Sequence, residues 1–403
     1  MSTAPVTKDK NSRPTICVVS PQENAYSQTF VRAHKEYLPA NIKSLYASDY
    51  ENLTDEHGPL VRPALSARLR RALLRKSLNL DSNYFQQHAL QRFLVRNRVG
   101  AVLAEFGPTA TLMMDACQKL QLPLIAHFHG FDAYRQQTLQ TYGRRYKKLF
   151  EIAAAIIAVS RDMQTQLQQL GAPLEKLHYN SCGVEPSIFT GADPLHSPPI
   201  FVAAGRFVNK KAPHLTLLAF KTTLEKAPDA RLLMIGDGPL WEACYQMTRS
   251  LGLTGAVELL GPTSQAEVAA TMQRSRAFVQ HSIRTQDGDS EGTPVAVLEA
   301  GASGLPVIAT RHAGIKDAVI EQKTGLLVEE GDINGMAEHM TRLANDPHLA
   351  AQLGKAGREW ISAQYSMEKS IARLWSIIET AMSTSVSAGR SFSPFPEEPV
   401  KET

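Results

Sequence analysis

The sequence has no long apolar run. Nowhere in its 403 residues do about 18 consecutive apolar residues occur, so no membrane-spanning helix is expected. The first residues, MSTAPVTKDKNSRP, are polar and do not contain the apolar stretch of a secretory signal. These absences predict a protein of the cytoplasm.

Cysteine is scarce and scattered. The four cysteines are Cys17, Cys117, Cys182 and Cys244, and no two of them lie close together in the sequence. The spacing of a zinc site or a redox pair is therefore missing. We expect reduced thiols that act as small apolar side chains, as is usual in the cytoplasm.

The chain also lacks a strong excess of charge of one sign, because its net charge is only +4. The distribution is uneven, with 23 Lys and Arg against 15 Asp and Glu in residues 1–190, and 20 against 24 in the remainder. No recognisable nucleic-acid-binding module accompanies the basic residues, so nucleic acid is not an expected partner. Many of them lie at 62–78, interleaved with leucines. That pattern is typical of a helix on an anionic membrane surface, or of a solvated helix face over core leucines.

Short apolar runs alternate with helical patterns along most of the chain. The expected strands are 15–20, 42–47, 101–105, 123–128, 154–160 and 176–179, then 200–205, 231–235, 257–260, 277–282, 306–310 and 325–328. This alternation predicts parallel sheets joined by crossover helices. Two such series indicate two doubly wound α/β domains of the Rossmann type.

The division between the domains is expected near the proline-rich segment 193–199, DPLHSPP, because proline interrupts both helices and strands. We therefore predict one domain over 1–193 and a second over 194–366. A helix follows over 367–383, and residues 384–403 have the composition of a flexible tail.

Polar residues follow several of the expected strands at their carboxyl ends. They are Glu105, His129, Arg206, Asp237 and the loop before Glu291. Open α/β sheets bind ligands at that edge. Two such edges facing each other predict a ligand-binding cleft between the domains.

The segment 287–306, DGDSEGTPVAVLEAGASGLP, is the most informative stretch. Thr293 and Pro294 form a typical helix start, with a capping oxygen and then a residue that has no N–H. Glu291 precedes this start, where free backbone N–H groups attract anions. Glu299 lies inside an otherwise apolar helix, which predicts burial. Its carboxylate then needs hydrogen-bond donors, either the hydroxyls of a ribose or a buried arginine or backbone N–H.

Two further segments carry suitable chemistry. The segment 205–213, GRFVNKKAP, follows a strand and opens a helix, where backbone N–H groups hold phosphate. Arg206 would offer a planar guanidinium to a diphosphate, and Lys211 a compact positive charge. The alternative is that both are incidental cations of a solvated loop. The segment 127–132, HFHGFD, places His129 at a strand end and His127 deeper, and either could be a core histidine.

The two glutamates, separated by seven residues and followed by Gly-x-Pro and Gly-Leu-Pro-Val, resemble the signature of glycosyltransferase family 4. The resemblance covers nearly all of the second domain and much of the first. Ser27-x-Thr-Phe30, Glu105-Phe-Gly and the Asp-Gly-Asp before Glu291 look like the exopolysaccharide or colanic-acid branch. The sequence departs from the family pattern at Ala212, where glycine is usual, and in the first loop, which lacks adjacent glycines.

The resemblance implies the GT-B fold, with two Rossmann-like domains facing across a cleft. The acceptor would bind the first domain and the donor the second, and the final helix would cross back to the first domain. Catalytic roles are implied for His129, Arg206, Lys211 and Glu291. The donor would be bound by Gly205, Arg206, Lys211, Gly236, Gly261, Glu291, Gly292, Thr293, Pro294, Val295 and Glu299.

The implied reaction is retaining transfer of a hexose from a nucleotide-diphosphate sugar, with a UDP-sugar favoured over GDP-mannose. The acceptor would be a saccharide or a lipid-linked saccharide, at the inner face of the membrane if the basic residues bind anionic lipid. No cofactor or metal is expected, since Asp287 and Asp289 have no further metal ligands nearby in the sequence. The alternatives are another GT-B enzyme, such as a nucleotide-sugar epimerase or phosphorylase, and a non-catalytic nucleotide-sugar-binding protein.

Overall fold

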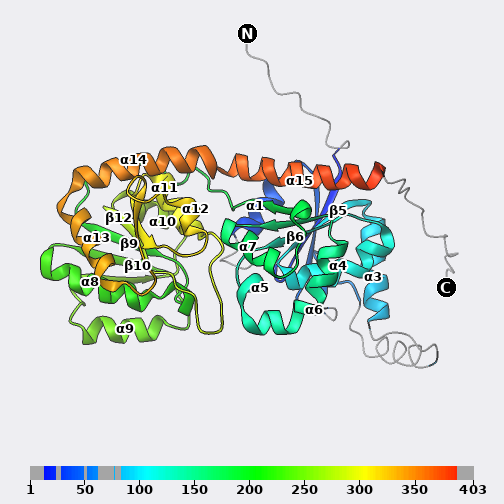
Figure 1. Ribbon diagram of the computed structural model, residues 1–403, viewed down its shortest axis with the longest axis horizontal. Coiled ribbons are helices and arrows are strands. Elements are labelled where there is room, and N and C mark those ends of the chain that lie inside the picture. The colour runs from blue at the N-terminus through cyan, green and yellow to red at the C-terminus, as the bar shows by residue number, and fades with distance from the viewer. Residues whose placement is uncertain (1–12, 24–28, 50–51, 62–76, 78–82, 388–403) are drawn as a thin grey trace, which may run out of the picture.

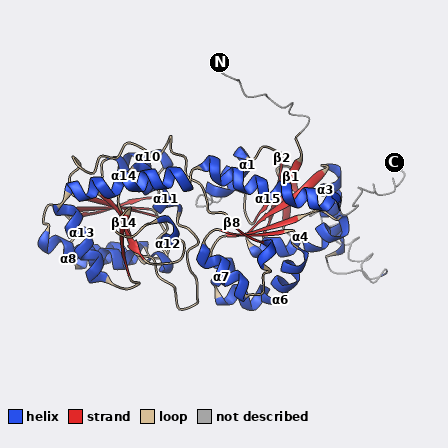
Figure 2. Ribbon diagram, turned by 45° about the horizontal axis from the view of Figure 1, so that its top comes forward, coloured by secondary structure: helices blue, strands red, loops and turns tan. Residues whose placement is uncertain are grey.

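The computed structural model describes residues 13–23, 29–49, 52–61, 77 and 83–387, which form two lobes. Each lobe contains a mostly parallel sheet with helices on both faces (Figures 1 and 2). The two-sheet α/β architecture expected from the sequence is confirmed.

The sheet of the first lobe has the strand order β4-β3-β2-β1-β5-β6-β7-β8. Its strands are β1 Thr15–Ser20, β2 Asn41–Ala47, β3 Leu53–Asp55, β4 Gly58–Pro59, β5 Val99–Glu105, β6 Leu124–Phe128, β7 Ala155–Ala158 and β8 Leu177–Tyr179. Its helices are α1 Thr29–Tyr37, α3 Tyr84–Arg96, α4 Gly107–Leu120, α5 Phe131–Tyr134, α6 Gln136–Ile152 and α7 Arg161–Gln169. The strands β3 and β4 are antiparallel and were not expected, because so short a hairpin shows no periodicity.

The sheet of the second lobe is entirely parallel, in the order β11-β10-β9-β12-β13-β14. Its strands are β9 Ile200–Ala204, β10 Arg231–Ile235, β11 Val257–Gly261, β12 Ala277–Gln280, β13 Val307–Thr310 and β14 Gly325–Val328. Its helices are α8 Pro213–Lys226, α9 Trp241–Ser250, α10 Gln265–Gln273, α11 Val295–Ser303, α12 Ile315–Ala318, α13 Ile333–Asn345 and α14 Pro347–Gln364.

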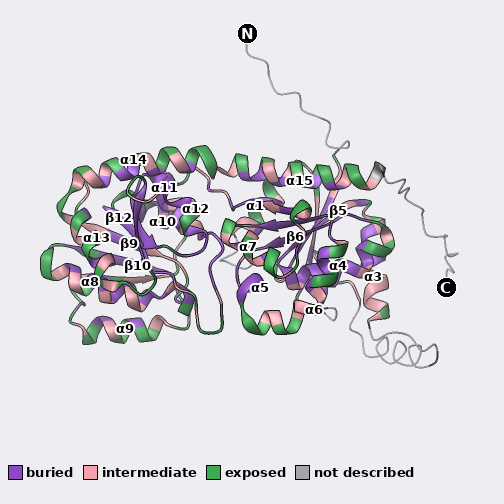
Figure 3. Ribbon diagram, in the orientation of Figure 1, coloured by how far each residue is buried: buried purple, intermediate pink, exposed green. Residues whose placement is uncertain are grey.

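The strands are buried on both faces, as Figure 3 shows for the centre of each lobe. In β1, Cys17 and Val19 pack into one core cluster, while Ile16 and Val18 face a second cluster on the opposite side of the sheet. Covered parallel strands read as continuous apolar runs, which is why the sequence revealed them. All four cysteines are buried free thiols.

The helix α15, Met367–Ser387, continues the line of α14 onto the first lobe (Figures 1 and 2). Its residues Ile371, Leu374 and Ile378 pack into the cluster formed by Ile16 and Val18 of β1. The first lobe is therefore closed by the last helix of the described chain.

This helix also corrects the expected start of the tail at residue 384. The helix continues to Ser387, since the chain offers no Gly or Pro before Gly389 to end it. The hydroxyls of Thr384 and Ser385 donate to the carbonyls of Thr380 and Ala381, at 2.9 and 3.0 Å, and so suit the last turns.

Most of the basic segment at 62–78 lies outside the described residues, and so do 388–403 and Ser27. Within the part of the chain that is described, no helix combines the length and the apolar character that a membrane crossing requires.

Candidate active site

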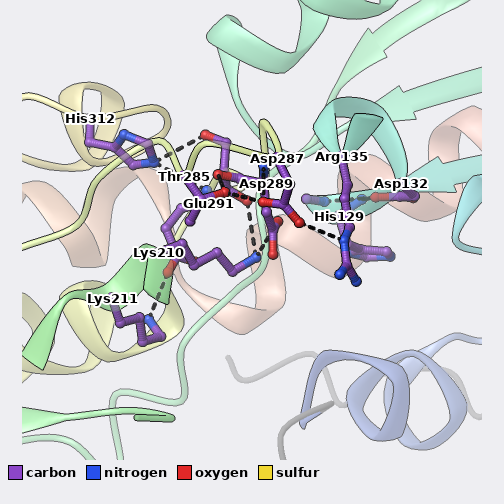
Figure 4. A network of polar contacts seen from close by, with 12 residues as sticks. His129, Asp132, Arg135, Lys210, Lys211, Thr285, Asp287, Asp289, Glu291 and His312 are labelled. Atoms are coloured by element: carbon purple, nitrogen blue, oxygen red, sulfur yellow. Dashed lines mark hydrogen bonds and ion pairs between the residues drawn. The ribbon is translucent and has the colours of Figure 1, made fainter. Parts of the chain in front are cut away.

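The two lobes meet at the carboxyl ends of their sheets, and Figure 4 shows His129 of the first lobe near Lys211 and Glu291 of the second. A Cβ atom placed on Gly292 would lie 2.3 Å from the backbone oxygen of His129. On the other side, a Cβ on Gly130 would lie 3.2 Å from the backbone oxygen of Ser290 and 3.5 Å from Lys210 Nζ. The loop after β6 thus lies directly against the loop that carries Glu291.

The loop after β6 is held by Asp132, which is fully buried. Its carboxylate accepts hydrogen bonds from the backbone N–H groups of His129 at 3.0 Å, Gly130 at 2.8 Å and Gly107 at 3.0 Å. Asp132 therefore orients the loop that carries His129 at the contact between the lobes.

His129 is neutral in this position. Burial lowers its pKa to about 3, and the nearby imidazole of His127 acts in the same direction. Its Nε2 lies 2.7 Å from the Glu105 carboxylate, and its ring stacks on Phe30 with centroids 4.1 Å apart. His127 lies deeper, at 1% exposure, as expected.

The segment after β9 brings positive charge to the same place. Lys211 Nζ lies 3.1 Å from Glu291 Oε1, while Arg206 is exposed at the lip of a pocket that both cations line. Burial opposes ionisation of Glu291, but positive charge from Lys211 and Lys210 outweighs it and lowers the pKa to about 2. Glu291 is therefore a carboxylate whose counter-charge comes from the expected phosphate-binding segment.

Lys210 was not singled out by the sequence, and it is the more deeply buried lysine of the pair, at 7% exposure. Its ammonium group lies 3.0 Å from Asp289 Oδ1 and 3.0 Å from the backbone oxygen of Ser290. Asp287 pairs instead with Arg135 of the first lobe, at 2.9 Å. Both aspartates of the Asp-Gly-Asp segment are thus engaged by cations.

The start of α11 differs from the expected one. Pro294 occupies the N-cap position, and the Thr293 hydroxyl donates to the backbone oxygen of Val159 at 2.7 Å. Thr293 therefore joins the lobes instead of capping the helix. No side chain caps α11, so its first N–H groups are available for an anion.

Glu299 also departs from the expected full burial. One stripe of α11, formed by Val295, Ala296 and Glu299, is partly exposed. It faces a cavity between the lobes, lined also by Phe30 of α1 and by Gln265. Burial raises the pKa of Glu299 to about 7, against the lowering effects of Gln265 and Lys211.

Three glycines join the strand ends beside Arg206. The N–H of Gly205 donates to Ile235 and that of Gly236 donates to Gly261, both at 2.9 Å. A Cβ on Gly236 would lie 2.0 Å from the backbone oxygen of Gly205, so only glycine fits there.

His312, just after β13, is another residue that the sequence reasoning missed. Its Nε2 accepts from the backbone N–H of Glu291 at 3.2 Å and lies 3.0 Å from Ser290 Oγ. Its Nδ1 donates to Glu330 at 2.5 Å. The histidine thus holds the loop that carries Glu291. The signal in the sequence that could have identified His312 is its position just after the carboxyl end of a strand.

Among the described residues, the grouping that could hold a metal ion is His34, Glu105 and His127, whose ligand atoms lie within 4.8 Å of one another. Both oxygens of Glu105 are already at hydrogen-bond distance, 2.7 Å, from His34 Nδ1 and His129 Nε2. The carboxylate oxygens that an ion would need are therefore already engaged by imidazoles.

Two family models match the chain. The model described as Glycosyltransferase Family 4 matches residues 44–188, and the model described as Glycosyl transferases group 1 matches residues 190–360. Together they cover most of both lobes.

Curated relatives agree with these matches. The amylovoran biosynthesis glycosyltransferase AmsK of Erwinia amylovora is 28% identical over 281 residues, 69% of each chain. The putative colanic acid biosynthesis glycosyltransferase WcaL of Escherichia coli is 28% identical over 70% of this chain and 71% of its own. A GDP-mannose-dependent phosphatidylinositol monomannoside mannosyltransferase of Mycolicibacterium smegmatis is 28% identical over 62% of this chain and 68% of its own.

Solved structures share the fold. HepE of Anabaena in complex with UDP superposes with a TM-score of 0.71 at 14% identity, covering 91% of this chain and all of that one. Sucrose-phosphate synthase of Thermosynechococcus elongatus gives a TM-score of 0.71 at 17% identity, covering 92% of this chain and all of that one.

Proposed function

Because this chain belongs to glycosyltransferase family 4 and has the GT-B fold, we propose that it transfers a hexose from a nucleotide-diphosphate sugar to a saccharide hydroxyl. The names of AmsK and WcaL support a role in exopolysaccharide or other cell-surface glycan assembly. HepE was solved with UDP, whereas the mycobacterial relative is named for GDP-mannose. The proposal favours a UDP-sugar.

The observation that carries the proposal is the convergence of charge at the lobe contact. Lys211 and Glu291 pair at 3.1 Å beside the exposed Arg206 and the uncapped start of α11. A diphosphate could bind there to the planar guanidinium of Arg206, the ammonium of Lys211 and the free backbone N–H groups of α11. This supports the diphosphate site, and His129 across the contact supports a sugar site next to it.

The leaving group is a nucleotide diphosphate, a stable anion that needs charge stabilisation more than protonation. Arg206, Lys211 and the α11 N-terminus supply that stabilisation in place of a metal. With retention, the bond from the anomeric carbon to the phosphate oxygen breaks as the acceptor oxygen bonds on the same face. The departing phosphate takes the acceptor proton. Glu291 and His129 hold the sugar hydroxyls, and Glu299 accepts from the ribose.

The acceptor is proposed to enter from the first lobe, where α1 borders the cavity that reaches Glu299. A lipid-linked saccharide at the inner face of the membrane fits a first half richer in basic residues. Sedimentation with anionic vesicles tests this part separately. Salt-sensitive binding supports a membrane-bound acceptor, and its absence favours a soluble saccharide.

The function itself is tested by thermal stabilisation with a panel of nucleotide diphosphates and nucleotide sugars, with and without a chelator. We expect one nucleotide to stabilise the protein selectively, with no effect of the chelator. Arg206→Ala should abolish turnover of the matching donor, whereas Arg249→Ala, at an exposed arginine of α9, should not. Undiminished turnover in Arg206→Ala would contradict the proposal, as would stabilisation by no member of the panel.

A further inference from the structure

Behind His129 lies a buried carboxylate surrounded by histidines. Glu105, at the end of β5, is 0% exposed, and its ion-pair partners among the described residues are three imidazoles. Its Oε1 lies 2.7 Å from His34 Nδ1, and its Oε2 lies 2.7 Å from His129 Nε2 and 3.2 Å from His127 Nδ1. The proposed donor contacts include His129 but assign no role to Glu105, His34 or His127.

The charge on the carboxylate determines where the histidine hydrogens lie. Despite burial, the pKa of Glu105 is well below its usual range, because His34 and His127 favour the ionised form and His129 hydrogen-bonds to it. An ionised carboxylate only accepts hydrogen bonds. The nitrogens at 2.7 Å therefore carry hydrogen, and His129 donates through Nε2–H.

His129 is neutral, so it has a single ring hydrogen. With that hydrogen on Nε2, the bare Nδ1 is left as a hydrogen-bond acceptor. The ring cannot turn freely to exchange the two nitrogens, since it lies against Phe30 at 4.1 Å and Phe106 at 4.8 Å between centroids. The geometry thus fixes both the tautomer and the direction of the ring.

We propose that Glu105 is a positioning residue that holds His129 as the Nε2–H tautomer, so that Nδ1 accepts a hydrogen bond from a hydroxyl of the transferred sugar. His34 holds the other carboxylate oxygen, Oε1, and His127 lies beside the oxygen that His129 contacts. The inference rests on the proposed transferase function and specifies it further. The sugar must present a hydroxyl donor at this position, and a deoxy or fluoro analogue lacks that donor.

Two other groups lie in the field of this carboxylate. Lys35 of α1 and the buried thiol of Cys182 both interact electrostatically with Glu105. Burial has the largest effect on each, lowering the pKa of Lys35 and raising that of Cys182 to about 12. The pKa of Glu105 itself stays well below its usual range, so the carboxylate is ionised at neutral pH. The tautomer of His129 should therefore be constant around neutral pH.

The tautomer is measured directly by NMR of the full chain labelled with ¹⁵N-histidine, comparing wild type, Glu105→Gln and a matched Glu225→Gln control on the exposed face of α8. Wild type and control should show His129 protonated at Nε2 alone at neutral pH. Glu105→Gln should shift population to Nδ1–H, because the amide can donate where the carboxylate only accepts. An Nδ1–H wild type, or an unchanged tautomer in Glu105→Gln, would overturn the inference. If Glu105→Gln does not fold, the wild-type spectrum alone decides.

Turnover provides the second readout. Glu105→Gln should lower kcat about a hundred-fold while leaving nucleotide affinity unchanged, because the misplaced group faces the sugar and not the diphosphate. Glu105→Asp, which restores the charge, should recover part of the loss. Unchanged kcat in Glu105→Gln, or a stoichiometric divalent metal that is lost in this variant, would overturn the positioning role. A wild type that turns over no donor contradicts the transferase proposal alone, since the NMR result stands without it.

Discussion

Glu299 is poised to change charge near neutral pH, because burial raises its pKa to about 7. In the proposed site, ribose hydroxyls would donate to the ionised carboxylate, so a bound nucleotide would stabilise that form. We predict that nucleotide affinity rises with pH up to about 7, by up to ten-fold per unit, and levels off above it. Calorimetric titration across this range measures the slope. Glu299→Gln should bind more weakly and without the slope, and a slope retained in this variant would assign it to another group.

The same group affects the ligand-free protein in the opposite direction. An unfolded glutamate ionises near its ordinary pKa, below the raised value of the folded state. The unfolded chain therefore releases its proton first, and stability falls as pH rises from about 4.5 to 7. Thermal denaturation of wild type and Glu299→Gln should show this difference between the two proteins. A parallel pH dependence in both would contradict it.

The adjacent lysines should differ in their effect on nucleotide binding. Lys210 is buried against Asp289 and the Ser290 carbonyl, so Lys210→Met should cost about 3 kcal/mol of stability. Lys211→Met should cost stability as well, because Glu291 loses its nearest counter-charge, and it should also weaken nucleotide binding. Urea denaturation and nucleotide titration of both variants check this. Equal effects of the two variants on nucleotide binding would contradict the distinction.

Individual site residues could be predicted from the sequence where they belong to a local motif. Residues whose partners lie far away in the sequence could not be predicted. Glu291 and Lys211 were found because strand-to-loop motifs contain them, and they meet in the structure. Lys210 contacts Asp289, 79 positions away, and His312 contacts Glu291, 21 positions away. No local pattern in the sequence indicates contacts over such separations. His34, and the pairing of Glu105 with His127 and His129, were missed for the same reason.

At the level of elements, the loop that precedes α11 can contact the first lobe closely because Gly292 has no side chain. Gly292→Ala would place a Cβ atom 2.3 Å from the His129 carbonyl oxygen, so the loop and the first lobe must separate. We predict a large loss of turnover, with nucleotide binding to the second lobe largely kept. Gly255→Ala is the matched control, because nothing lies within 4 Å of its added Cβ. Equal activity of both variants would show that the contact is dispensable.

The helix α15 stabilises a lobe to which it does not belong in sequence. Leu374 is completely buried against the first sheet, so Leu374→Ala should cost about 2–5 kcal/mol of stability. Ser376→Ala, on the exposed side of the same helix, should have little effect. Calorimetric melting should show whether the loss falls on the unfolding of the first lobe. A loss confined to the second lobe would contradict this packing.

The expected strands largely match those of the structure, because parallel strands covered on both faces are apolar throughout. The short strands and the start of α11 were predicted less accurately. The α11 start was misplaced because the Thr293 hydroxyl has a partner across the lobes, at Val159, and tertiary contact overrode the local capping preference. The antiparallel β3 and β4 were too short to show alternation.

In the whole molecule, ion pairs between the lobes hold the observed closure. Lys316 of the second lobe lies 3.1 Å from Asp162 of the first, and Arg135 lies 2.9 Å from Asp287. These groups are partly exposed, so Lys316→Glu should open the molecule modestly, more at low salt than at high salt. Small-angle scattering should detect the larger radius, and adding Asp162→Lys should restore it. An unchanged radius in Lys316→Glu at low salt would show that the apolar contacts suffice.

The two-lobe arrangement could be predicted from alternation and from the proline-rich break, but the contact between the lobes could not. Nothing local in the sequence indicates that Gly292 touches the carbonyl of His129, because such a contact is a property of two surfaces. The facing of the two sheet edges came from the resemblance, and the residues that make the contact came from the structure.

The crossing of α15 also bears on how the chain is made. On the ribosome, the last strand of the first sheet ends at Tyr179, yet Ile371, Leu374 and Ile378 emerge much later. At about 5–20 residues per second, one apolar face of that sheet stays uncovered for roughly ten to forty seconds. The nascent first lobe is therefore a natural client for a chaperone that binds near the ribosome exit. The emergence of α15 is the event that completes the N-terminal lobe.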